Sequence, residues 1–114
     1  TFRMTDIWRS FVAQRCLWAM DSVVTFHAAE VIQRRNVHNL LKDFQDEVPG
    51  YLHNEAICQT LEGVKLKRGP EAVGENLRRC YEALVGQGIL PKKELGLVRA
   101  WLRDLDAIAG GLLL

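Results

Sequence analysis

Apolar side chains recur at helical spacing over most of the chain, and this periodicity constrains the fold more than any other feature. In residues 7–20, apolar residues follow each other at nearly every third or fourth position, with Arg9, Ser10 and Gln14 on the opposite face. The same spacing in residues 52–64, 73–85 and 95–105 predicts three further amphipathic helices. Most of the 114 residues are therefore expected to be helical.

Proline and glycine mark the expected ends of these helices. The Pro-Gly dipeptide at 49–50 predicts the end of a short helix or turn that begins near Asn36 or Asn39. Pro70 suits a first helical turn, and Gly88 lies where the next helix should close. The chain is therefore expected to contain separate helices on either side of residues 49–50.

One segment favours a strand instead of a helix. The run "VVTFHA" at 23–28 is β-branched and aromatic, a composition that suits a pleated strand. Its partner would be either "EVIQ" at 30–33 or a sheet supplied by sequence outside the chain. The predicted fold class is mainly α with a small β contribution: a helix, short strands, then about four helices, in one fragment with one hydrophobic core.

Composition excludes several classes of function. Fifteen Lys plus Arg against fourteen Asp plus Glu leave a net charge of +1, so no nucleic-acid partner is expected. No apolar run approaches the roughly 20 residues that span a membrane, so no membrane segment is expected. Cys16, Cys58 and Cys80 are far apart and outside any CxxC spacing. We interpret them as small core hydrophobes and not as a zinc site or disulfide framework.

Asp6, Trp8 and Arg9 form the first candidate site. A carboxylate at a helix start stays ionised beside free backbone N–H groups and could accept a proton from an attacking hydroxyl. The Trp8 indole offers a flat face for a sugar ring or base, and Arg9 could bind phosphate or carboxylate. The alternative is structural: a helix cap at Thr5 or Asp6, a core tryptophan and a solvated arginine.

The polar run "QRRNVHNLLKDFQDE" at 33–47 supplies the second candidate site. Arg35, Asn36 and His38 follow the expected strand, where α/β enzymes place substrate loops. His38 could act as an acid, a base or a metal ligand, oriented by one of the acidic residues that follow it. Alternatively, the histidine is a structural hydrogen bonder and the acidic run a solvated helix face. The Asp-x-Asp at 104–106 lies within a leucine-striped helix and is expected to be surface charge.

Several short motifs together resemble the STELLO-like family of glycosyltransferases. They are "TDIWRSF" at 5–11, "QRCLW" at 14–18, "QRRNVH" at 33–38, "DFQDEVPGY" at 43–51 and "AWLRDL" at 100–105. Asp-Ile-Trp at a helix start also resembles the reversibly glycosylated polypeptides, which are UDP-arabinopyranose mutases, but that family's pattern lacks the segments that read "QRRNVH" at 33–38 and "DFQDEVPGY" at 43–51 here. The STELLO-like resemblance covers most of the chain.

The resemblance implies the C-terminal part of a GT-A-type domain, a larger α/β nucleotide-diphospho-sugar transferase. Residues 1–48 would form the acceptor-side helix, strand and polar loop, and residues 49–114 a helical extension. The donor-binding half would precede Thr1, so the isolated chain would be inactive. The compartment stays open between Golgi and cytoplasm.

The resemblance also assigns roles to the candidate residues. Asp6 would be the catalytic base, and Trp8 would line the acceptor cleft. Arg35 and His38 would approach the donor diphosphate or its metal, and Arg9 and Asn36 would bind substrate in the same cleft. Any divalent cation, Mn²⁺ or Mg²⁺, would be held mainly by the donor-binding half, with His38 as the one ligand this chain could add.

The alternative function is a helical protein–protein interaction module without catalytic activity. Its docking surface would be the Trp and Leu stripes of the last two helices. The two hypotheses differ in geometry, because the enzyme hypothesis requires Asp6 and His38 to face a common hollow.

Overall fold

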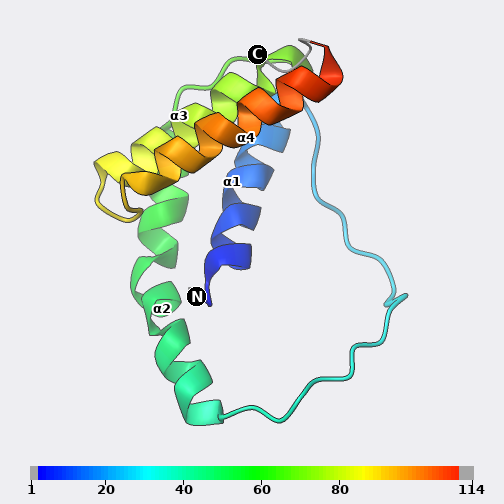
Figure 1. The fold of residues 1–114 in the computed structure, drawn as a ribbon, viewed down its shortest axis with the longest axis vertical. Helices are drawn as coiled ribbons and strands as arrows, with labels where there is room; N and C mark the ends of the chain where they lie inside the picture. The colour runs from blue at the N-terminus through cyan, green and yellow to red at the C-terminus, as the bar shows by residue number, and fades with distance from the viewer. Residues whose placement is uncertain (1–2, 111–114) are drawn as a thin grey trace.

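A computed structural model describes residues 3–110, which form four α-helices and one short 3₁₀ turn (Figure 1). The elements are α1 (Thr5–Ala19), α2 (Leu40–Gly63), the turn η1 (Pro70–Ala72), α3 (Val73–Gly86) and α4 (Lys93–Ala109). No strand occurs in this part of the chain, so the expected small β contribution is wrong. None of its helices is both long enough and apolar enough to cross a membrane.

Helices α1 and α2 lie side by side and run in the same direction (Figure 1). The Trp8 indole Nε1 donates to Asn54 Oδ1 at 2.8 Å, and Arg15 Nε donates to the Leu61 carbonyl at 2.8 Å. Moving seven residues along α1 therefore moves the contact seven residues along α2, as parallel helices require. Helices α3 and α4 form an antiparallel hairpin that packs across this pair.

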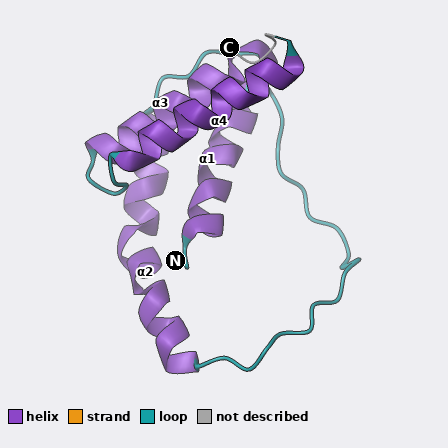
Figure 2. Ribbon diagram, in the orientation of Figure 1, coloured by secondary structure: helices purple, strands orange, loops and turns teal. Residues whose placement is uncertain are grey.

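The parallel arrangement of α1 and α2 explains why residues 23–28, which were expected to form a strand, lie in a long connecting loop. The chain must return along the length of α1, about 22 Å at 1.5 Å per residue, before α2 can begin. Residues 22–39 make this return as an extended loop, most of which lies away from the helices (Figure 2). Phe26 is 95% exposed and Val31 87% exposed. A β-branched composition favours a strand only where a neighbouring strand is available, and none is described here.

The expected break at Pro49 is also wrong, because α2 continues through it. Proline lacks an N–H group, so this helix loses one backbone hydrogen bond at that position. Contacts on both sides of the proline hold α2 against α1: Arg3 Nε donates to Glu47 Oε1 at 3.3 Å, and Trp8 donates to Asn54. Tertiary packing thus maintains a helix that local sequence would end.

The core lies where α1, α2 and α3 meet. Helix α1 supplies a stripe at four-residue spacing, and the other helices close over it. The buried cluster comprises Met4, Trp8, Val12, Cys16, Ile57, Leu61, Cys80 and Leu84. The expectation that Cys16 and Cys80 are core hydrophobes is confirmed, and Cys58 is half-buried. A hydrogen bond with Cys16, together with burial, raises the pKa of the Cys80 thiol, so Cys80 stays protonated.

Asn76 is a buried polar residue that the sequence patterns did not single out. It is completely buried in α3, where its Nδ2 donates to the Lys67 carbonyl at 2.7 Å. Its Oδ1 accepts from the Lys67 backbone N–H at 2.9 Å. The Asn76 amide therefore satisfies both the N–H and the carbonyl of Lys67, which have no backbone partner in this loop, and so fixes the loop between α2 and η1.

Candidate functional site

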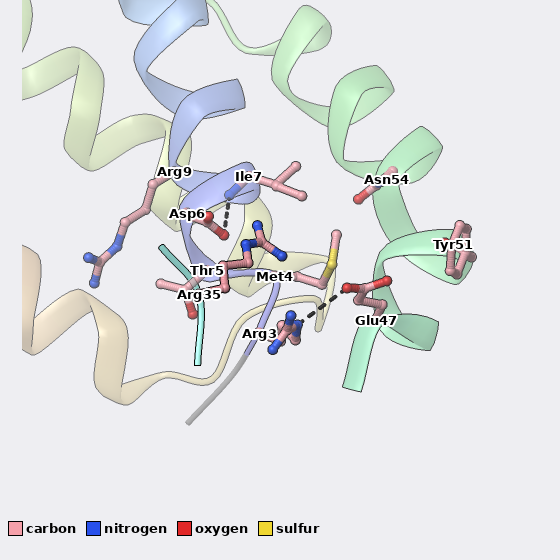
Figure 3. A pocket seen from close by; sticks show the side chains of 10 residues that line it. All are labelled: Arg3, Met4, Thr5, Asp6, Ile7, Arg9, Arg35, Glu47, Tyr51 and Asn54. Carbon is pink, nitrogen blue, oxygen red and sulfur yellow. Dashed lines mark hydrogen bonds and ion pairs between the residues drawn. The ribbon is translucent and has the colours of Figure 1, made fainter. Parts of the chain in front are cut away.

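A hollow of about 780 Å³ lies between the N-terminal end of α1 and the first half of α2 (Figure 3). Side chains from α1 line one side and side chains from α2 line the other, with Arg35 contributed by the connecting loop. The lining residues are Arg3, Met4, Thr5, Asp6, Ile7, Arg9, Arg35, Glu47, Tyr51 and Asn54. Of the six predicted site residues, the hollow brings together Asp6, Arg9 and Arg35.

Asp6 lies in the first turn of α1 and is exposed. Its Oδ1 accepts a hydrogen bond from the Ile7 backbone N–H at 3.0 Å, drawn in Figure 3. The residue preceding the helix is Met4, which makes no side-chain capping bond, so the expected cap at Thr5 or Asp6 is wrong. Asp6 instead presents its carboxylate in the first turn of α1, at the positive end of the helix dipole.

The arginines give the hollow a net positive charge. Arg3, Arg9 and Arg35 line it together with two carboxylates, those of Asp6 and Glu47. Arg3 is committed to α2, because its Nη1 lies 2.9 Å from Asp43 Oδ1 and its Nε bonds Glu47. The two remaining guanidinium groups are thus the groups of this hollow that could bind an added anion.

Arg9 also reaches toward α3. In Figure 3 its guanidinium points away from the Asp6 carboxylate. Burial raises the pKa of Tyr81, and the neighbouring Arg9 guanidinium opposes that shift. Arg9 therefore lies between the hollow and the first helix of the α3–α4 hairpin.

Trp8 does not line the hollow. Its side chain is 6% exposed, its indole N–H is bonded to Asn54, and His53 packs edge-on against its ring at 6.2 Å between centroids. The indole face that was expected to contact a sugar belongs to the α1–α2 contact. Trp8 can affect the hollow only indirectly, by positioning Asn54, which does line it.

Asn36 and His38 are also absent from the hollow's lining. Asn36 is exposed in the connecting loop. His38 Nδ1 lies 3.7 Å from Asp43 Oδ2, and Asp43 in turn contacts Arg3. His38 is thus linked to the hollow through two intervening side chains. The expectation that Asp6 and His38 face a common hollow is therefore wrong, because of the two only Asp6 lines it. Of the acidic residues that follow His38, Asp43 is the one that lies next to its imidazole.

The residues near His38 do not fit a divalent cation by themselves. Within residues 3–110, no group of three His, Cys, Asp or Glu side chains is arranged to hold a metal ion. Asp43, the carboxylate nearest the imidazole, is already neutralised by Arg3.

Sequence patterns missed the α2 side of the hollow. Tyr51 and Asn54 contribute to it, together with Glu47. Glu47 was noted only as one of several acidic residues that follow His38. The register of two parallel helices depends on packing between positions about 46 apart, and no local pattern encodes that offset.

Fold and hollow together define an all-helical unit with a polar, net-positive hollow that exposes one carboxylate. Residues 3–111 match the profile of the STELLO glycosyltransferases, and the chain therefore belongs to that family. Neither the curated proteins nor the solved structures searched gave a match. The family membership predicted from the sequence motifs is confirmed.

Proposed function

We propose that the hollow is the acceptor side of a sugar-transfer site, with Asp6 as its catalytic base. Membership in a glycosyltransferase family supports a transfer reaction. The observation that carries the assignment is the exposed Asp6 carboxylate at the edge of a hollow that also contains Arg9 and Arg35. These groups match what a transfer needs: a proton acceptor, and cations for an anionic donor.

The proposed step is an inverting transfer from a nucleotide sugar. An acceptor hydroxyl attacks the anomeric carbon, the new carbon–oxygen bond forms, and the bond to the nucleoside diphosphate breaks. Asp6 accepts the hydroxyl proton. Its Oδ1 is held by the Ile7 N–H, which leaves Oδ2 for the acceptor. Arg9 and Arg35 offset the charge on the departing diphosphate.

The donor-binding half is proposed to lie in sequence outside this chain, in a GT-A-type arrangement. That half would bind the nucleotide and any Mn²⁺ or Mg²⁺. The chain would then complete the acceptor side and be inactive in isolation. The roles of Asn36 and His38 in substrate binding remain predictions that the lining of the hollow does not support.

Titration of the full-length protein with a panel of UDP- and GDP-sugars, with and without Mn²⁺, tests this function. Saturable binding of at least one sugar nucleotide, weakened by Arg35→Gln, is the expected result. Arg34→Gln is the matched control, because Arg34 is a loop arginine that does not line the hollow. Failure to bind any member of the panel would contradict the proposal.

A second candidate function is a protein–protein interaction module. Leu97, Trp101 and Ile108 lie along one face of α4, and they are 60%, 54% and 84% exposed. Such a stripe is typical of a helix that docks against another apolar surface. If this were the principal function, Trp101→Ser would abolish activity in cells while Asp6→Asn would have no effect.

A further inference from the structure

A second hollow, of about 400 Å³, lies beside the contact between α3 and α4. Arg78 comes from α3, and Arg99 and Arg103 come from α4. Gly96 and Leu102 complete the lining, which contains no carboxylate. The first hollow shares none of these residues.

The charges around this second hollow are only partly balanced. Arg78 Nη1 pairs with Glu82 Oε1 one turn along α3. Arg99 and Arg103, by contrast, make no ion pair or hydrogen bond with any residue in the described range 3–110. They also stand four residues apart on the same helix, where two like charges destabilise the helix by a few tenths of a kcal/mol.

This arrangement differs from the other arginines that contact the helical body. Arg3 and Arg79 are held by carboxylates, and Arg15 is held by the backbone carbonyls of Leu61 and Val64. An anion between Arg99 and Arg103 would remove their mutual repulsion and gain charge-assisted hydrogen bonds from both. Gly96 has no side chain, and apart from its chain neighbours and the backbone of α4 no atom lies within 4 Å of the position its Cβ would take, so a ligand can approach the helix there.

We infer that Arg78, Arg99 and Arg103 form a binding site for a phosphate group, separate from the proposed sugar-transfer hollow. Guanidinium groups bind phosphate oxygens in bidentate geometry, and a hollow of this size admits a diphosphate or the headgroup of a phospholipid. The site does not depend on the role assigned to Asp6.

The test is an NMR titration of the chain with inorganic pyrophosphate, followed by Arg99→Gln/Arg103→Gln. Saturable chemical-shift changes confined to Arg78 and residues 96–103 are expected. The affinity for pyrophosphate should be about a hundredfold weaker in the double variant, since each of the two lost charged hydrogen bonds is worth about a factor of ten. The matched control, Arg34→Gln/Lys65→Gln, removes two exposed positive charges elsewhere and should bind as wild type does.

Vesicles of phosphatidylcholine with and without phosphatidic acid distinguish the source of the phosphate. Co-sedimentation that requires phosphatidic acid and Arg99 with Arg103 assigns a lipid headgroup, and binding of pyrophosphate alone assigns a soluble ligand. Three results would overturn the site. They are an equal loss of affinity in both double variants, chemical-shift changes spread over all basic residues, and no binding of either probe at millimolar concentration. Circular dichroism of each variant confirms that its helices are intact.

Discussion

The indole Nε1 of Trp8 lies 2.8 Å from Oδ1 of Asn54, and this hydrogen bond joins the buried face of α1 to the edge of the candidate site. Trp8 is in the core, whereas Asn54 lines the hollow. The bond therefore sets how α2 presents its polar side chains toward Asp6. Disturbing the core at Trp8 should change the hollow without touching any ligand.

Trp8→Phe is expected to lower the free energy of unfolding by about 1–2 kcal/mol. The variant loses the indole donor and leaves the Asn54 oxygen without that partner, in addition to a small packing defect. Urea denaturation measures the change. Trp101→Phe is the matched control, because Trp101 is more than half exposed on α4, and its effect should be within about 0.5 kcal/mol. Equal stability of the two variants would contradict the assigned role of Trp8.

Asn76→Ala is expected to cost about 2–3 kcal/mol of stability. The substitution removes both hydrogen bonds between the buried Asn76 side chain and the Lys67 backbone, and leaves the Lys67 N–H and carbonyl without that partner. Thermal unfolding followed by circular dichroism is the measurement. Asn36→Ala, in the exposed loop, serves as the control. An Asn76 variant as stable as that control would show that the loop between α2 and η1 is held by other contacts.

Glu75 should give stability a dependence on acid pH. Contacts with Lys67 and Arg79, each at 2.6 Å, lower the pKa of Glu75 below its ordinary value of 4.5. The ionised form is therefore favoured by folding. Its contribution is present above pH 4.5 and is lost as the pH falls through the lowered pKa of the folded state.

Glu75→Gln should consequently flatten the decline in unfolding free energy that accompanies acidification below pH 4.5. Denaturation curves collected across that range provide the test. Glu62→Gln is the matched control, since Glu62 makes no ion pair within residues 3–110. Parallel pH profiles for wild type and the Glu75 variant would rule out this contribution.

The connecting loop should be the first part of the chain that a protease cuts. Residues 22–39 are exposed along their whole length and make no helix or strand. Limited trypsin digestion is expected to cleave after Arg34 and Arg35 before it cleaves after Arg15 or Arg79, which are held in helices. Mass spectrometry identifies the cut sites. Early cleavage within α1 or α3 would contradict the described loop and helix positions.

Local patterns predicted the helices well and their arrangement poorly. Val98 and Leu102 of the predicted α4 stripe are buried as helical periodicity requires, although Trp101 of the same stripe is 54% exposed. Gly88 closes the turn after α3 with a positive φ of 72°. The prediction of a strand at residues 23–28 was wrong for a physical reason. The strand propensity of this segment describes how side chains fit a sheet, and the described fold has no sheet for them to join.

The sequence predicted only part of the candidate site, because some of its residues are brought together by tertiary packing and not by a local motif. Asp6 and Arg9 share one turn of α1, so a short motif was enough to place them together. Arg35 joins them only because the last part of the connecting loop reaches the hollow, and Asn54 joins them only through the parallel register of α2. Trp8 was ambiguous, because a core indole and a sugar-stacking indole have the same local sequence pattern.

The most direct test of the central claim is the transfer rate of the full-length protein carrying Asp6→Asn, measured with the sugar nucleotide found to bind. Asn keeps the side chain's shape but cannot accept the acceptor proton. The rate should fall by a factor of about 10²–10⁴ while donor binding and helical content are unchanged. The control is Asp104→Asn, an exposed aspartate on α4, which should retain the wild-type rate. A wild-type rate for Asp6→Asn would contradict the assignment of this hollow as the acceptor side of the transfer site.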